Sequence, residues 1–359
     1  MLRRTKGSQS SQVPGKVLVT GGAGFVGSHV AEHFALSGSQ VIVLDDLSRS
    51  RKLGLTGLDS SKFNWGFLAR YPNITRVKKS VLDKETTDRL TADVDLVVHT
   101  AGQVAVGTSV ADPWTDYLTN CQGTVNVLEG CRKSRGNPSL VFCSTNKVYG
   151  ENVNTISVGE AEKRYFFSDR GFRSGVPETL SVDGCKHTPY GASKLAADLY
   201  VQEYGRTYGQ RTAAFRMSCI YGERQFGVED QGWVAHFILS ALVGRPVTIF
   251  GDGKQVRDVL YVGDLVRAID AFTARRAKSI VFNVGGGPQH TLSLLELIEM
   301  IASLTGKQPQ IRFSGWRPAD QRVYISDIRR AQAELRWKPM VNPRSGVSAL
   351  VRWAQGIAT

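Results

Sequence analysis

The feature that most constrains this chain is a glycine-rich turn between a strand-like run and a helix-like run, residues 17–30 (VLVTGGAGFVGSHV). Gly21 permits a tight turn, Gly24 lets a phosphate approach the backbone, and Gly27 lets the helix lie against the strand. The free N–H groups of the first helical turn suit a pyrophosphate. The pattern therefore predicts a dinucleotide-binding β-α-β unit.

An acidic residue follows the glycines at the spacing that a dinucleotide site requires. A second apolar run, residues 40–44, ends in Asp45, about 20 residues past the turn, where a carboxylate accepts ribose hydroxyls. Asp45 and Asp46 would repel a 2′-phosphate, which favours NAD over NADP. The nearby Arg49 and Arg51 keep NADP open.

The order of apolar segments indicates an α/β fold. Strands alternate with helices over the first two-thirds of the chain, which predicts a Rossmann-type doubly wound parallel sheet. Beyond residue 220 the alternation becomes irregular, as expected for a smaller C-terminal substrate-binding lobe interleaved with the sheet. We expect a disordered basic tail over 1–15, an NAD-binding domain over 16–220 and mainly the substrate lobe over 221–359. Further strands are expected at 40–44, 74–78, 94–99, 140–143 and 212–216, and helices at 84–90, 113–133, 190–208, 263–275, 293–304 and 343–355.

Composition narrows the class of protein. No apolar run of the chain approaches the ~20 residues that span a bilayer. The basic residues 1–6 precede no apolar segment, so we expect no secretory signal; a disordered tail and a transit peptide are the alternatives. The five cysteines are scattered and form no CxxC pair, which predicts reduced thiols in a cytoplasm and no metal site.

The formal net charge of +13 suggests an anionic partner. A diphosphate-bearing small molecule accounts for part of this charge, and solvated surface for the rest. Nucleic acid is a competing partner, but no basic stripe with interleaved aromatic residues supports it.

A tyrosine and a lysine four residues apart are the candidate catalytic pair. Tyr190 and Lys194 share one face of an expected helix, so the ammonium favours the phenolate. A tyrosine that titrates near 10 needs such a cation to act as a base at neutral pH. Ser144 and Thr145 end a strand where ligands of such sheets bind. Together they suit hydride transfer at a carbinol; the alternative is a surface Tyr–Lys contact.

These motifs resemble those of the extended short-chain dehydrogenases/reductases, and within them of the nucleotide-sugar epimerases and dehydratases. The resemblance covers about residues 16–355 and rests on further blocks: 99–105 (HTAGQVA), 144–150 (STNKVYG), 189–194 (PYGASK), 221–226 (YGERQF), 230–234 (DQGWV), 251–260 (GDGKQVRDVL) and 320–323 (DQRV). It implies Tyr190 as base, Lys194 as electrostatic partner and ribose ligand, and Thr145 as hydrogen-bonding helper.

The resemblance also implies the ligand-binding residues. Cofactor-binding residues would be Gly21, Gly24, Phe25, Val26, Gly27, Asp45, Asp46, Ser48, Arg49, Ser80, Val81, Ala101, Gly102, Gln103, Asn120, Ser144, Tyr190, Lys194 and Met217. Substrate-binding residues would be Gln103, Thr145, Asn146, Arg224, Gln231, Gln255, Arg257, Arg317 and Asp320. Of these, Arg257 and Arg317 would hold the diphosphate, a task that suits guanidinium groups; a surface salt bridge is the alternative for each.

Two departures and one open choice qualify the family pattern. Lys79 and Ser80 stand where the family usually has Gly-Asp against the adenine, which puts cofactor affinity there in question. Asn146 and Lys147 stand where the dehydratases have an Asp-Glu acid/base pair, so we expect no dehydratase. The resemblance implies epimerisation at C2 of a CDP-linked dideoxyhexose; a UDP-sugar 4-epimerase and a non-catalytic nucleic-acid-binding member of the fold are the alternatives.

Family habit also implies a homodimer through the helices near 113–133 and 190–208. The long segment 151–187 and the block 230–233 are the expected wall around the sugar.

Overall fold

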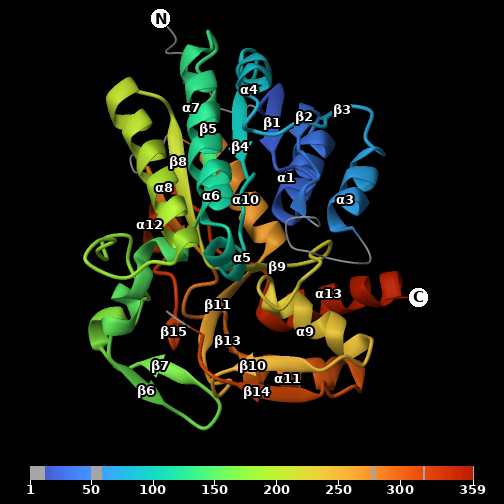
Figure 1. Ribbon diagram of the computed structural model, residues 1–359, viewed down its shortest axis with the longest axis vertical. Coiled ribbons are helices and arrows are strands. Elements are labelled where there is room, and N and C mark those ends of the chain that lie inside the picture. The colour runs from blue at the N-terminus through green and yellow to red at the C-terminus, as the bar shows by residue number, and fades with distance from the viewer. Residues whose placement is uncertain (1–12, 50–58, 276, 278–279, 318–319, 359) are drawn as a thin grey trace, which may run out of the picture.

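The computed structural model describes residues 13–49, 59–275, 277, 280–317 and 320–358. Its main layer is a parallel seven-stranded sheet with the order β12-β8-β5-β4-β1-β2-β3 (Figure 1). The strands are β1 (Lys16–Thr20), β2 (Gln40–Leu44), β3 (Ile74–Val77), β4 (Leu96–His99), β5 (Ser139–Thr145), β8 (Thr212–Met217) and β12 (Val281–Val284). The expected doubly wound sheet is confirmed. Most of the expected tail and Arg51 lie outside the described residues.

Helices cover both faces of this sheet, because its strands bury alternate side chains on either side. Val17 and Val19 of β1 pack into one core and Leu18 into the other. The first core includes α1 (Phe25–Leu36), α3 (Ser60–Leu68), α10 (Val262–Thr273) and α12 (Arg329–Leu335). The second includes α4 (Lys84–Thr91), α7 (Gly123–Lys133) and α8 (Pro189–Tyr208).

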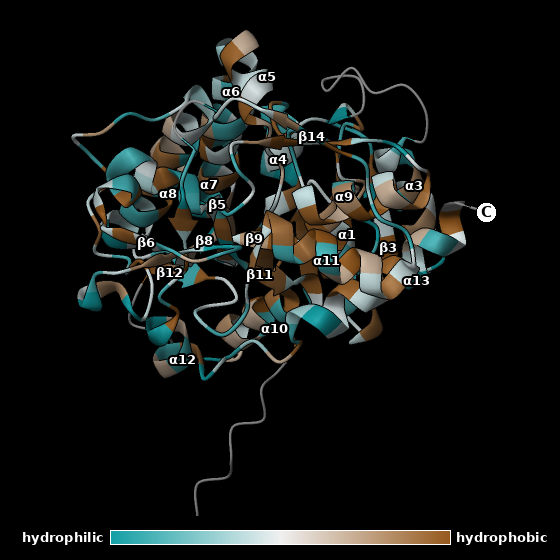
Figure 2. Cartoon of the chain, turned by 90° about the horizontal axis from the view of Figure 1, so that it is seen from below, coloured by the Kyte–Doolittle hydropathy of each residue, from teal (hydrophilic) through white to brown (hydrophobic). Residues whose placement is uncertain are grey.

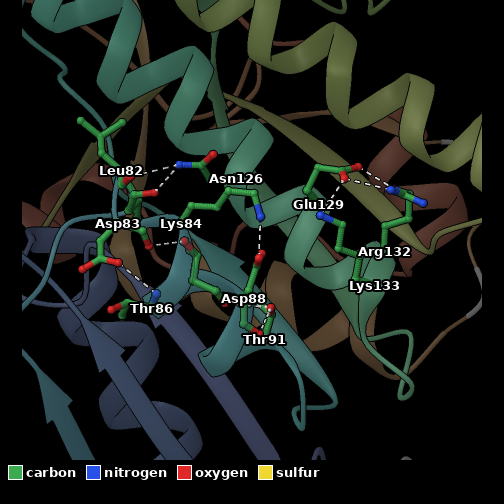
Figure 3. Close-up of polar contacts among 12 residues, drawn as sticks. Leu82, Asp83, Lys84, Thr86, Asp88, Thr91, Asn126, Glu129, Arg132 and Lys133 are labelled. Carbon is green, nitrogen blue, oxygen red and sulfur yellow. Dashed lines mark hydrogen bonds and ion pairs between the residues drawn. The ribbon is translucent and has the colours of Figure 1, made fainter.

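The loop after β3 is held by α4 and α7, as Figure 3 shows. Asp83 caps α4 by accepting a hydrogen bond from the backbone N–H of Thr86, 3.0 Å away. Asn126 of α7 donates to the carbonyl groups of Val81 at 3.0 Å and Leu82 at 3.5 Å. This contact fixes the backbone of the segment that was expected to face the adenine.

The expected helix 113–133 is not uniform. It consists of α6 (Pro113–Tyr117), a π-helical turn η1 (Leu118–Gln122) and α7. Single π-helical turns inside longer helices are frequent at functional sites. Here the turn contains Asn120, whose side-chain amide donates to the hydroxyl of Ser193 on α8 at 3.0 Å.

The C-terminal part of the chain builds a smaller second layer below the main sheet in Figure 1. It contains the strands β9 (Cys219–Tyr221), β10 (Val247–Phe250), β11 (Val256–Tyr261), β13 (Thr291–Ser293), β14 (Ile311–Ser314) and β15 (Val323–Tyr324), and the helices α9 (Trp233–Leu242), α11 (Leu294–Thr305) and α13 (Pro343–Ala358). Figure 2 shows hydrophobic residues along α9 and α11, and these helices share one core with α13. Residues 281–284 return to the main sheet as β12, beside β8, so the two layers are interleaved in sequence.

The segment 151–187, which the sequence left without regular structure, contains a short hairpin. Its strands are β6 (Val158–Glu160) and β7 (Tyr165–Phe167), between the 3-10 helices η2 (Asn146–Thr155) and η3 (Arg170–Phe172). A further short helix, α5 (Val106–Ala111), precedes α6. Within the described residues no helix is long and apolar enough to cross a membrane.

Candidate active site

The glycine-rich turn has the geometry that a pyrophosphate cradle requires. Gly21 has φ +68°, and a Cβ atom there would lie 2.5 Å from the backbone nitrogen of Ala101. A Cβ atom at Gly27 would lie 2.3 Å from the carbonyl oxygen of Gly21. Both positions therefore exclude any side chain, and the backbone at the start of α1 stays open to a ligand.

The end of β2 supplies the acidic part of the same cleft. One carboxylate oxygen of Asp45 accepts the backbone N–H of Ala23 at 2.9 Å, and the other accepts that of Leu47 at 2.8 Å. Asp46 accepts the hydroxyl of Ser48 at 2.5 Å. These contacts fix both carboxylates beside the glycine turn, in the cleft that Ser80 and its neighbours also line. The residues present thus fit an adenosine with free ribose hydroxyls.

Tyr190 lies at the start of α8, where Thr188 caps the helix by accepting the backbone N–H of Gly191. Burial raises the pKa of Tyr190 to about 12; a hydrogen bond from Thr145 opposes this shift and the nearby Asp116 carboxylate adds to it. The tyrosine therefore needs a bound cation before it can act as a base at neutral pH.

Lys194 is buried one helical turn after Tyr190. Its ammonium donates to the carbonyl of Cys143 at 2.7 Å and lies 4.0 Å from the centre of the Phe142 ring. Burial lowers the pKa of Lys194 to about 8, although the thiol of Cys143 and the carboxylate of Asp198 act in the opposite direction. The lysine is thus held at the carboxyl end of β5.

A buried polar network supports the start of α8 from behind. Asp116 accepts hydrogen bonds from Ser193, from Asn120 at 3.1 Å and from Gln103 at 3.1 Å. Burial raises the pKa of Asp116. The side chain of Asn120 is engaged within this network, and that of Gln103 is engaged by Asp116 and by the backbone of Ala105. These two residues therefore shape the wall of the cleft.

Ser144 belongs to a second buried network. Its hydroxyl donates to Asp198 at 2.6 Å, and Asp198 also pairs with Arg216 of β8 at 3.0 Å. The two charged side chains are 0% and 5% exposed. This network ties α8 to β5 and β8, and so sets the position of Tyr190 and Lys194 relative to the sheet.

The charged residues of the second layer form a basic pocket next to the catalytic groups. Arg257 of β11 pairs with Asp320 at 2.8 Å. Arg317 pairs with Asp230 at 3.2 Å and lies 4.0 Å above the Phe250 ring. Both guanidinium groups line this pocket, which Gln255 and Asp320 also line, and they could meet a diphosphate.

Two further expected ligand-binding residues are also bound to other parts of the protein. The guanidinium of Arg224 pairs with Glu32 of α1 at 2.7 Å. The side-chain oxygen of Gln231 accepts a hydrogen bond from Arg49 at 2.8 Å, which joins the cofactor side of the cleft to the block 230–233. Their roles toward substrate stay predictions.

The structure brings the expected residues into three adjoining pockets. The adenosine side is lined by Gly21, Gly24, Asp45, Asp46, Ser48, Arg49, Ser80, Val81, Ala101, Gly102 and Gln103. The central cleft is lined by Phe25, Val26, Gly27, Ser144, Thr145, Asn146, Tyr190, Lys194, Met217, Arg224 and Gln231, and the basic pocket by Gln255, Arg257, Arg317 and Asp320. Asn120 lies behind these walls.

Sequence reasoning missed several lining residues. Lys147 lines both the central cleft and the basic pocket, and Thr248 and Phe250 of β10 line the latter. The sequence pointed to Lys147, because the block Asn146-Lys147 stands where the dehydratases have an acid/base pair. No sequence motif marks the residues of β10. Among the described residues no group of three or more His, Cys, Asp or Glu side chains could hold a metal ion.

Comparison with known proteins identifies the class. The chain belongs to the NAD dependent epimerase/dehydratase family, whose model matches residues 17–285. This membership confirms the expected enzyme class and its cofactor, NAD. A solved structure similar to this chain, UDP-glucuronic acid 4-epimerase of Bacillus cereus, also contains NAD. The glycine turn, the Asp45 carboxylate and the Tyr190–Lys194 pair are the parts of this chain that such a cofactor would meet.

Individual relatives are similar over nearly the full chain. CDP-paratose 2-epimerase of Salmonella typhi is 38% identical over 95% of this chain and 100% of its own. A putative UDP-glucose 4-epimerase of Methanocaldococcus jannaschii is 31% identical, with 94% and 97% covered. Among solved structures, UDP-glucose 4-epimerase of Thermotoga maritima with UDP-glucose has a TM-score of 0.77 at 30% identity, with 96% and 100% covered. UDP-glucuronic acid 4-epimerase of Bacillus cereus with UDP-glucuronic acid and NAD has 0.77 at 27%, with 95% and 99% covered.

Proposed function

We propose that the protein epimerises a CDP-linked dideoxyhexose at C2, converting CDP-paratose into CDP-tyvelose or acting on a close relative. The observation that carries this proposal is the 38% identity to a CDP-paratose 2-epimerase over that protein's whole length. The arrangement of Thr145, Tyr190 and Lys194 at one end of β5 supports it, because reversible oxidation of a carbinol needs this set of groups.

The residues divide the reaction between them. Tyr190 accepts the proton of the C2 hydroxyl, and Thr145 holds the tyrosine by a hydrogen bond. We assign Lys194, one helical turn further on, to favour the phenolate by its charge. The chemistry that NAD would supply when bound is reversible hydride transfer at C2. Arg257 and Arg317 keep the diphosphate in place while the planar keto sugar turns and presents its other face. Tyr190 then returns the proton.

Turning of the sugar requires an enclosed but loosely contacted pocket. The block 230–233 lies at the junction of the central cleft and the basic pocket, where Asp230 and Trp233 line both. Asp230 is fixed by Arg317 and Gln231 by Arg49. We assign this block as one wall of the sugar site. The substrate would then bind between the part of the chain before about residue 220 and the part after it.

The competing candidate is 4-epimerisation of a UDP-sugar. Its support is the likeness to a putative UDP-glucose 4-epimerase and to a 4-epimerase structure holding UDP-glucose. The chemistry at the carbinol is the same, so the residues around Tyr190 serve both reactions.

The test uses CDP-paratose deuterated at C2. We expect CDP-tyvelose with the label retained at C2, read by NMR, and no consumption of external NAD. Reduced cofactor accumulating in proportion to substrate would mean net oxidation. Loss of the label to solvent would mean deprotonation beside a carbonyl, and turnover of UDP-glucose with CDP-paratose inert would favour the 4-epimerase.

We also propose that the protein is a homodimer in a reducing cytoplasm. α6 and α8 expose large apolar side chains, namely Trp114, Tyr117, Leu199 and Tyr200. Such side chains suit a helical interface between two copies. Sedimentation of the protein, and of a Trp114→Ser variant, tests the dimer.

All five cysteines are free thiols, which suits a reducing compartment.

A further inference from the structure

The block Asn146-Lys147 contains a cation that the proposed mechanism leaves without a task. Lys147 follows Thr145 by two residues, and its backbone N–H donates to the Thr145 hydroxyl at 3.3 Å. Its side chain is half-buried and lines both the central cleft, with Tyr190, and the basic pocket, with Arg257. Lys147 therefore stands where the two pockets meet.

Three other cations of the site have protein partners. Arg257 has Asp320, Arg317 has Asp230, and Lys194 has the carbonyl of Cys143. Within the described part of the chain, only the backbone N–H of Lys147 makes a hydrogen bond, and its ammonium has neither a hydrogen bond nor an ion pair. Burial lowers the pKa of Lys147, as does the charge of Arg257, while Asp320 opposes the shift. An anion at this junction would relieve both effects.

The order of groups in a nucleotide sugar identifies that anion. The sugar lies at Tyr190 and the nucleotide extends past Arg257, so the phosphate linked to the sugar lies between them. We propose that Lys147 is a positioning residue that binds this sugar-linked phosphate. The class of ligand is a nucleoside diphosphate whose second phosphate reaches the catalytic cleft.

This placement also bears on the reacting carbon, and here it rests on the proposed function. In a hexose, C2 is bonded to C1, which carries the phosphate, whereas C4 lies across the ring. Because Lys147 lines the same cleft as Thr145 and Tyr190, a phosphate held by it is near the groups that take the proton. That proximity suits oxidation at C2. A carboxylate at position 147, as in the dehydratase pattern, would repel the phosphate.

The test compares nucleoside diphosphate with monophosphate binding by titration calorimetry on the NAD-loaded protein. In Lys147→Met we expect the ratio of CDP to CMP affinity to fall about 10- to 100-fold, the loss typical of a hydrogen bond between charged groups. CMP affinity should stay within about threefold. Lys147→Arg should restore much of the ratio, and UDP against UMP should behave alike, because the base is not involved.

Lys163→Met is the matched control, since Lys163 is a half-exposed lysine paired with Glu299 at 2.6 Å outside the site. It should leave the ratio unchanged. An unchanged ratio of CDP to CMP affinity in Lys147→Met would overturn the proposal. If kcat fell while this ratio stayed the same, the lysine would act in proton transfer instead. The ratio needs no turnover, so failure of CDP-paratose as substrate would refute the proposed function and leave this assignment standing.

Discussion

Replacing Lys194 by methionine should stabilise the cofactor-free protein while it removes activity. The lysine is buried, and its pKa falls from an ordinary value of 10.5 to about 8. A difference of this size corresponds to about 3 kcal/mol by which burial disfavours the charged lysine at neutral pH. Methionine has a similar length and no charge, so it avoids this cost.

The net gain is smaller, because the hydrogen bond to the Cys143 carbonyl is lost at a cost of about 1 kcal/mol. We therefore expect a net stabilisation of about 2 kcal/mol at pH 7. Unfolding entropy scales with length, and for this chain amounts to about 0.75 kcal/mol per kelvin at the midpoint. The expected rise in Tm is thus about 3 °C.

The pH dependence gives the sign of the effect. The folded pKa of Lys194 lies below its unfolded value, so between about pH 8 and 10.5 the unfolded chain binds more protons. The stability of the unaltered protein therefore rises with pH in this window, and its deficit against Lys194→Met should close. Calorimetry of both proteins without NAD, at pH 7 and near pH 10, measures this. A variant less stable than the parent at pH 7, with a gap that does not change with pH, would refute the reasoning.

Three further predictions concern neighbouring residues. Tyr190→Phe should lower kcat at least ~10²-fold and keep NAD bound, since only the proton acceptor is lost; near-full turnover would contradict its role. Asp45→Ala should weaken NAD binding about 10-fold in a fluorescence titration, and tighter binding of NADP than NAD by the unaltered protein would overturn the ribose assignment. Asp198→Asn leaves Arg216 buried without its counter-charge, so Tm should fall by roughly 4–7 °C; an unchanged Tm would show that the pair contributes nothing.

The sequence predicted the dinucleotide half of the fold closely because its signals are local. The strand, the glycine turn and the acid at Asp45 are fixed by steric demands on the backbone, which leave few alternatives. β2 has the expected bounds, Gln40–Leu44, and α8 begins one residue before the expected Tyr190. Buried strands and long amphipathic helices carry such signals in their own residues.

Elements that depend on distant partners escaped prediction. The buried face of α3 is mostly polar, with Leu68 as its only buried apolar residue, and the helix packs into the same core as α1. The π turn at Asn120 is invisible in a pattern that reads as one helix, because a single extra residue is accommodated by hydrogen bonds to Ser193 and Asp116. The hairpin at 158–167 lies in a segment whose polar residues gave no period.

The same distinction applies to the site. Ser144 and Gln103 were expected to touch the cofactor, and both lie in or beside the cleft. The hydroxyl of Ser144 donates to Asp198, and the amide of Gln103 donates to Asp116. No sequence motif links either residue to its partner. A motif therefore locates a residue at a cleft, but its hydrogen-bond partner decides whether it contacts a ligand or supports the wall.

The electrostatics of Tyr190 and Lys194 predict that cofactor must be bound before the tyrosine acts as a base. Burial raises the pKa of Tyr190 and lowers that of Lys194, so it displaces both groups toward their neutral forms. A neutral tyrosine with a partly neutral lysine is a poor base at neutral pH. A bound NAD would supply a positive charge that favours the phenolate, and a phenolate in turn favours the charged lysine. Each group thus restores the working form of the next, and a sugar that enters without NAD meets a tyrosine that keeps its proton.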